Sequence, residues 1–208
     1  MNGGIFDLMT PAKRQEIAIR KALEQRKRVW PRQPDEVYAG AGDLLLCHGR
    51  FFQGRELPDA YQHLFQLDGG QGNCFRNAWF AAKESGLPYY EGVYNFGAGH
   101  FTPHAWLVAP DGELLELTVD TKPELIARGI EARSSEKMLP VEHWGYWGIE
   151  LHVDYVEAVS KAEGAYGGTL DRPIHDELFK DDPTQNVSDD RDRWPIYTYP
   201  YRANRREP

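Results

Sequence analysis

Cys74 and His104 are the residues whose types and surroundings could support covalent catalysis. Cys74 follows a small-residue loop, residues 68–73, and begins a segment whose apolar residues recur at helical spacing. A helix N-terminus and a neighbouring imidazole both stabilise a thiolate, which is the reactive form of cysteine. Cys74 has the first by position, and His104 could supply the second. Such a thiolate would attack an amide or ester carbonyl.

A carboxylate behind the imidazole would complete the arrangement, because it fixes the tautomer and stabilises imidazolium. Residues 103–109 and 113–119 flank a Pro-Asp-Gly turn and predict a β-hairpin. A three-residue loop puts His104, Glu116 and Asp120 on one face of this hairpin. A two-residue loop would move both acids to the opposite face. The sequence leaves open the register, and also whether Glu116 or Asp120 is the third member.

Groups that could hold an oxyanion precede Cys74. The loop offers backbone N–H groups, and Gln71 and Asn73 offer side-chain amides. We expect no cofactor and no metal, since the spacing of the available ligand types matches no standard zinc pattern: Cys47, His48, Cys74, His100 and His104. Cys47 lies in an apolar run, and we expect it to pack in the core.

The elements that must position these side chains follow from periodicity and turn residues. A helix is predicted from Cys74 to the C-cap at Gly86. Strands are predicted over 88–96, 103–109, 113–119 and 146–151, and a helix over 153–163. Residues 43–52 could form a strand or a short helix, and 57–67 look helical or turn-like. A helix followed by consecutive strands favours an α+β fold with an antiparallel sheet.

Charge and composition divide the chain into three regions. Residues 1–42 are expected to hold a basic N-terminal helix and linker, 43–168 one domain, and 169–208 an irregular extension. Thr10 can cap the helix, Pro11 suits its first turn, and one side with Ile19, Leu23 and Trp30 can pack. Residues 11–32 carry eight basic and two acidic side chains, a net +6. With a total of −8, the remainder therefore carries −14.

These global properties exclude several classes of protein. A chain of 208 residues with 41% apolar and 12% aromatic residues can bury a core, so disorder throughout is excluded. The net charge of −8 argues against nucleic-acid binding by the whole domain. Two cysteines cannot form a disulfide framework. We expect no secretory signal and no membrane-spanning segment, and hence a cytoplasmic protein.

The order of these motifs resembles the papain-like and transglutaminase-like cysteine enzymes. Their pattern of Cys, then His-x-Trp, then an acid corresponds to Cys74, His104-Ala105-Trp106 and Glu116-Leu117-Thr118. The spacing, together with Asn77-Ala78, Gly92 and Tyr146-x-Gly148, also looks like a poorly characterised group of bacterial and phage proteins with that core. The similarity covers residues 43–168. Glu116 stands where the family usually has Asp, and Leu117 replaces its usual Pro.

The resemblance implies a papain/transglutaminase-like fold and a thiol-dependent acyl hydrolase or acyltransferase. Its substrate would be a peptide or small amide. A second hypothesis is an inactive binding protein that keeps the fold, as a phage or host-interaction module, with a protein partner on the basic helix or the C-terminal extension. A different alignment of Gln71-Gly72-Asn73-Cys74 with papain relatives would make Cys74 structural and put Asn77 at the nucleophile's position.

Overall fold

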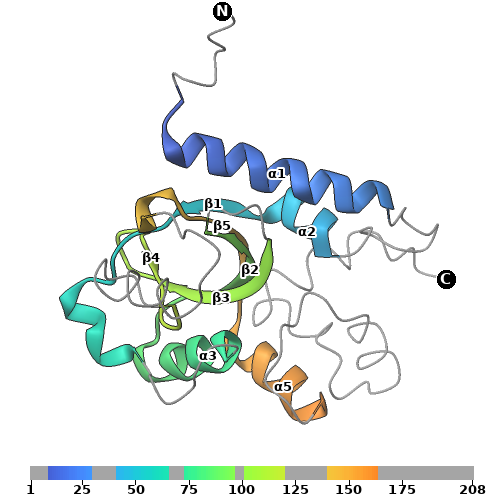
Figure 1. Ribbon diagram of the computed structural model, residues 1–208. Coiled ribbons are helices and arrows are strands. Elements are labelled where there is room, and N and C mark those ends of the chain that lie inside the picture. The colour runs from blue at the N-terminus through green and yellow to red at the C-terminus, as the bar shows by residue number, and fades with distance from the viewer. Residues whose placement is uncertain (1–8, 30–40, 66–72, 97–100, 120–139, 164–208) are drawn as a thin grey trace, which may run out of the picture.

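A strongly curved antiparallel sheet forms the centre of the protein. The computed structural model describes residues 9–29, 41–65, 73–96, 101–119 and 140–163. Within them, a five-stranded sheet has the order β1-β5-β2-β3-β4. Its strands are β1 (Arg50–Gln53), β2 (Tyr89–Asn95), β3 (Thr102–Val108), β4 (Leu114–Leu115) and β5 (Gly145–Leu151). The sheet is nearly closed, like a barrel (Figure 1). The predicted α+β class with an antiparallel sheet is confirmed.

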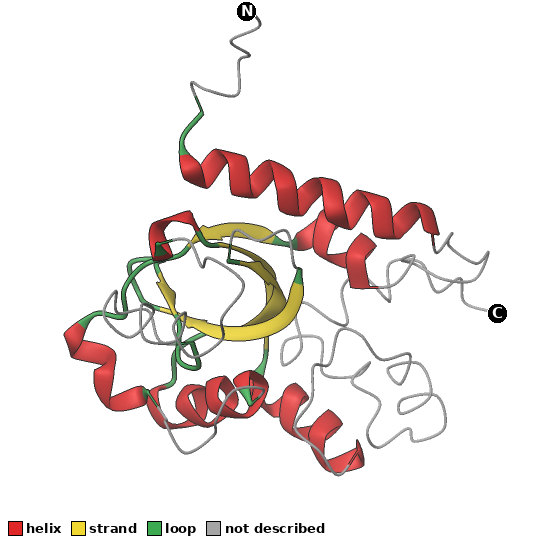
Figure 2. Ribbon diagram, in the orientation of Figure 1, coloured by secondary structure: helices red, strands yellow, loops and turns green. Residues whose placement is uncertain are grey.

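The helices lie outside the curved sheet (Figure 2). They are α1 (Pro11–Val29), α2 (Ala41–His48), α3 (Cys74–Ser85) and α5 (Val153–Glu163). Their apolar sides join the outward-facing strand residues in one core that includes Leu45, Ala78, Leu107 and Val156. Among the described helices, none is both long enough and apolar enough to cross a membrane.

Helix α1 begins and packs as its sequence predicts. The backbone N–H of Lys13 donates to Thr10 Oγ1 at 3.3 Å, which is the expected N-cap. Ile19 and Leu23 are buried in the outer core, whereas Trp30 lies outside the described residues. The predicted apolar side of this basic helix is therefore confirmed at these two positions.

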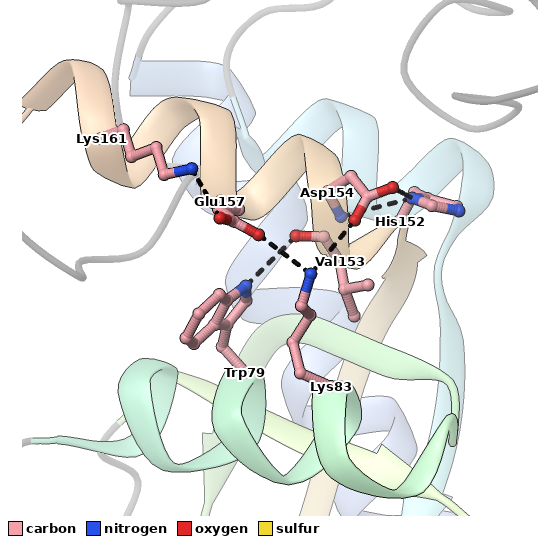
Figure 3. Close-up of polar contacts among 7 residues, drawn as sticks. All are labelled: Trp79, Lys83, His152, Val153, Asp154, Glu157 and Lys161. Carbon is pink, nitrogen blue, oxygen red and sulfur yellow. Dashed lines mark hydrogen bonds and ion pairs between the residues drawn. The ribbon is translucent and has the colours of Figure 1, made fainter.

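Helix α3 is held against α5 by one buried ring and a set of charges (Figure 3). Trp79 Nε1 donates to the Val153 carbonyl at 3.2 Å. Lys83 Nζ lies 3.5 Å from Asp154 Oδ1 and 3.0 Å from Glu157 Oε2. Because such partly exposed ion pairs contribute little, the buried apolar side chains of the two helices, Trp79 among them, carry most of this contact.

The inner face of the sheet is lined by aromatic rings, among them Tyr90, Trp106 and Tyr146. Two glycines allow close approaches in this sheet, one to a ring and one to the neighbouring backbone. Gly92 and Gly148 face each other across β2 and β5. A Cβ at Gly148 would collide with the Trp106 ring, and one at Gly92 would collide with the Trp147 carbonyl. Both positions therefore require the close approach that only glycine allows.

Three local expectations need adjustment. Residues 43–52, predicted as a strand or a short helix, contain parts of both: α2 ends at His48 and β1 begins at Arg50. Residues 57–67 contain the short 3-10 helix η2 (Asp59–Leu64). The expectation that Cys47 packs in the core is wrong: it is exposed, because it lies on the solvent side of α2, while Leu44 and Leu45 face the core.

Candidate active site

The hairpin of β3 and β4 has the register that the three-residue loop predicts. Leu107 pairs with Leu115 and Val108 with Leu114. The backbone N–H of Ala109 donates to the Glu113 carbonyl at 2.8 Å, which closes the loop. His104 and Glu116 consequently share the inner face, and the alternative two-residue loop is excluded.

A short hydrogen bond joins these two side chains. His104 Nε2 lies 2.7 Å from Glu116 Oε2. Both side chains are almost completely buried. Of the two acids that the sequence left open, Glu116 contacts the imidazole, and Asp120 lies outside the described residues.

Cys74 is the first residue of α3, and it is buried where this helix packs on β3. Its thiol lies close enough to His104 to help raise the pKa of the imidazole. Since Nε2 is taken by Glu116, Nδ1 is the ring nitrogen left for the thiol. The structure thus brings Cys74, His104 and Glu116 together.

The electrostatics of the site favour a charged imidazole. Burial alone would lower the pKa of His104. The Glu116 carboxylate and the hydrogen bonds with Cys74 and Glu116 outweigh burial and raise this pKa to about 10. Burial would likewise raise the pKa of Glu116, yet His104 and two backbone N–H groups lower it. An imidazolium–carboxylate pair is therefore the favoured state at neutral pH.

The Glu116 carboxylate accepts four hydrogen bonds. Oε1 accepts from the backbone N–H groups of Thr118 at 2.8 Å and Val119 at 3.0 Å. Oε2 accepts from the Tyr146 hydroxyl at 2.9 Å as well as from His104. A buried carboxylate needs such a set of donors to stay ionised, and this set also fixes its orientation.

Asn77 connects the cysteine helix to the same segment. Its side-chain amide donates to Thr118 Oγ1 at 3.2 Å. The alternative alignment puts the nucleophile's position at Asn77, one turn beyond Cys74. In the structure His104 interacts with Cys74, and Asn77 instead links α3 to the chain that follows β4.

Several predicted site residues lie outside the part of the chain that the structure describes. Gln71, Asp120 and His100 belong to segments that the structure does not describe, as do residues 164–208. Asn73 is described, and its exposed side chain makes no capping hydrogen bond to α3.

The sequence named Tyr146 and Asn77 as parts of the resembling pattern, and Asn77 in the alternative alignment, but it did not predict the hydrogen bonds that they make in the site. Tyr94 was also missed, although its ring lies 4.5 Å from that of His104. The available signal was strand alternation: Tyr94 and Tyr146 face each other on paired strands, on the side where His104 lies.

Among the described residues, no group of three or more His, Cys, Asp or Glu side chains is arranged to hold a metal ion. The fold and the site together define an α+β protein with a buried Cys–His–Glu cluster. Comparisons with known protein families, with curated proteins and with solved structures find no match.

Proposed function

We propose that the protein is a thiol-dependent acyl hydrolase or acyltransferase with Cys74 as its nucleophile. The observation that carries this proposal is the buried His104, which interacts with Cys74 on one side and is 2.7 Å from Glu116 on the other. A nucleophile, a base and a group that orients the base are the three parts that covalent acyl transfer needs. The resemblance to papain-like and transglutaminase-like enzymes supports the same chemistry.

In the proposed reaction, the reacting form carries the proton of the Cys74 thiol on the His104 imidazolium, and the sulfur attacks a carbonyl carbon. The tetrahedral intermediate collapses when the bond to the amine or alcohol breaks, and His104 returns the proton to that leaving group. The product is a thioester on Cys74. Water or an amine then attacks the thioester, gives a proton to His104, and releases the acyl group while the thiol is restored.

The start of α3 offers donors for the developing oxyanion. Backbone N–H groups in the first turn of a helix have no acceptor within that helix, and the Cys74 N–H is one of them. The Asn73 side chain, which does not cap the helix, could supply a second donor. The substrate class that this site supports is a peptide or small amide, or an ester.

The two cysteines of the chain provide an internal comparison for a test. Cys47 is exposed and Cys74 is buried, so burial alone predicts faster alkylation of Cys47. We expect iodoacetamide at pH 6 to modify Cys74 faster than Cys47, measured in the single-cysteine variants Cys47→Ser and Cys74→Ser. The physical reason is that an adjacent imidazole activates a cysteine as a nucleophile.

His104→Ala is the matched control, and it should remove the advantage of Cys74 while leaving the rate at Cys47 unchanged. If Cys74 reacts more slowly than Cys47 and His104→Ala makes no difference, the catalytic proposal is wrong. The inactive binding protein that retains the fold then becomes the better hypothesis.

A further inference from the structure

Tyr146 shares an oxygen of Glu116 with His104. Its hydroxyl donates to Oε2 at 2.9 Å, and His104 Nε2 lies 2.7 Å from the same atom. Tyr146 belongs to β5, His104 to β3, and Glu116 follows β4. Two strands of the sheet and the segment that follows β4 therefore meet at one carboxylate oxygen.

The Tyr146 side chain is fully buried and fixed by its neighbours. Its ring stacks on Tyr94 at 5.6 Å and meets the edge of Trp106 at 5.3 Å. The hydroxyl of so confined a ring cannot turn to a different acceptor without repacking the inner face. It is a directed donor, and the atom toward which it is directed is Glu116 Oε2.

We propose that Tyr146 is a positioning residue, whose hydroxyl holds Glu116 Oε2 in line with His104 Nε2. This inference deepens the proposed function and rests on it for its catalytic meaning. The two backbone donors fix Oε1 alone, and they leave the carboxylate free to tilt about that oxygen. Tyr146 supplies the restraint on Oε2, so that His104 keeps Nδ1 turned toward Cys74.

A second consequence concerns proton affinity. The groups that face His104 are Cys74 from α3, Tyr94 from β2, Tyr146 from β5 and Glu116 itself. A hydroxyl that donates to the carboxylate stabilises its negative charge. The carboxylate then attracts the imidazolium proton less strongly. Tyr146 therefore limits how tightly His104 holds its proton, which helps His104 to release it to a leaving group.

The test is Tyr146→Phe, which removes the hydroxyl and keeps the ring. We expect the Nε2 proton resonance of His104 to shift in nuclear magnetic resonance spectra. We also expect the pH at which His104 loses its proton to rise by about one pH unit. Tyr90→Phe is the matched control, because its hydroxyl donates at 3.1 Å to Glu150, a different carboxylate. It should leave both His104 signals unchanged.

Two outcomes would overturn the inference. One is Tyr146→Phe with a lowered unfolding temperature but unchanged His104 signals, since a purely structural role predicts that result. The other applies even where the variant does not fold: in the wild-type protein, the Tyr146 hydroxyl proton and the His104 Nε2 proton should show a nuclear Overhauser contact. Absence of that contact would show that they do not share the oxygen.

These readouts are independent of the alkylation test. A reactive Cys74 with unchanged His104 signals would leave the proposed function intact and overturn the positioning role. An unreactive Cys74 with shifted signals would overturn the proposed function and support the contact between Tyr146 and Glu116.

Discussion

Glu116 gives the site its particular geometry at the scale of single residues. Strand β4 ends at Leu115, and the Glu116 side chain that follows it contacts both the His104 ring and the backbone N–H groups of Thr118 and Val119. An aspartate at this position would be one methylene shorter, so we expect it to lose part of these contacts. Glu116 is also the position at which the chain departs from the pattern of the papain-like and transglutaminase-like enzymes.

The His104–Glu116 pair also predicts how stability depends on pH. The pKa of His104 is raised from 6.5 to about 10, so its contribution is complete below pH 6.5 and is lost as pH rises toward 10. The pKa of Glu116 is lowered from 4.5, so its contribution is complete above pH 4.5 and is lost as pH falls below that value. We expect the pair to stabilise the protein most between pH 4.5 and 6.5.

Glu116→Gln should therefore reduce the free energy of unfolding at pH 6 by about 3 kcal/mol. It should also flatten the decline in stability between pH 6.5 and 10. Urea unfolding across this pH range measures both effects. Glu116→Asp is the control for the length of the side chain, and it should reduce the free energy of unfolding as Glu116→Gln does. Recovery of wild-type stability with aspartate would show that the contact with His104 does not need the longer side chain of glutamate.

At the scale of elements, the sequence predicted the hairpin and its register but overestimated the length of its second strand. Residues 113–119 have the composition of a strand, yet β4 comprises Leu114–Leu115 alone. The chain turns after Leu115 because the Glu116 side chain accepts the backbone N–H groups of Thr118 and Val119. A side chain that bonds to its own backbone competes with the sheet ladder. Strand propensity does not account for this competition between a side chain and the sheet.

The parts of the site that the sequence could predict are those set by local pattern. Cys74 at a helix start follows from apolar spacing and the Gly86 cap, and the face shared by His104 and Glu116 follows from the loop length. The contact of Tyr146 with Glu116 joins residues 30 positions apart. It depends on the placing of β5 beside β2, which no local pattern in this chain specifies.

The link between α3 and the segment after β4 makes an element-scale prediction. Asn77 and Thr118 join the two at 3.2 Å, so they hold Cys74 in place beside His104. A double-mutant cycle of Asn77→Ala and Thr118→Val should give a coupling energy of about 1 kcal/mol in urea unfolding. Each single variant should also slow alkylation of Cys74. Additive effects, together with an unchanged alkylation rate, would show that this bond does not position the helix.

At the scale of the whole molecule, the two faces of the sheet have separate roles. The outer face packs against the helices and forms the larger core, and the inner face holds the aromatic rings together with His104. Strands β2, β3 and β5 contribute side chains to both faces. Packing on the outside therefore determines the strand positions on which the geometry of the site depends.

A variant of helix α1 tests whether the outer core extends to the basic N-terminal region. Ile19 is fully buried and lies in the outer core, so Ile19→Ala should lower the free energy of unfolding by about 2–5 kcal/mol. Because α1 and the sheet share one core, far-ultraviolet circular dichroism and tryptophan fluorescence should follow one coincident transition at a lower midpoint. Lys21→Ala, at an exposed position of the same helix, is the control and should leave the midpoint nearly unchanged.

If α1 were a separately folding appendage, Ile19→Ala would shift part of the dichroism signal and leave the fluorescence transition where it was. Such a result would separate the basic helix from the unit that contains the site.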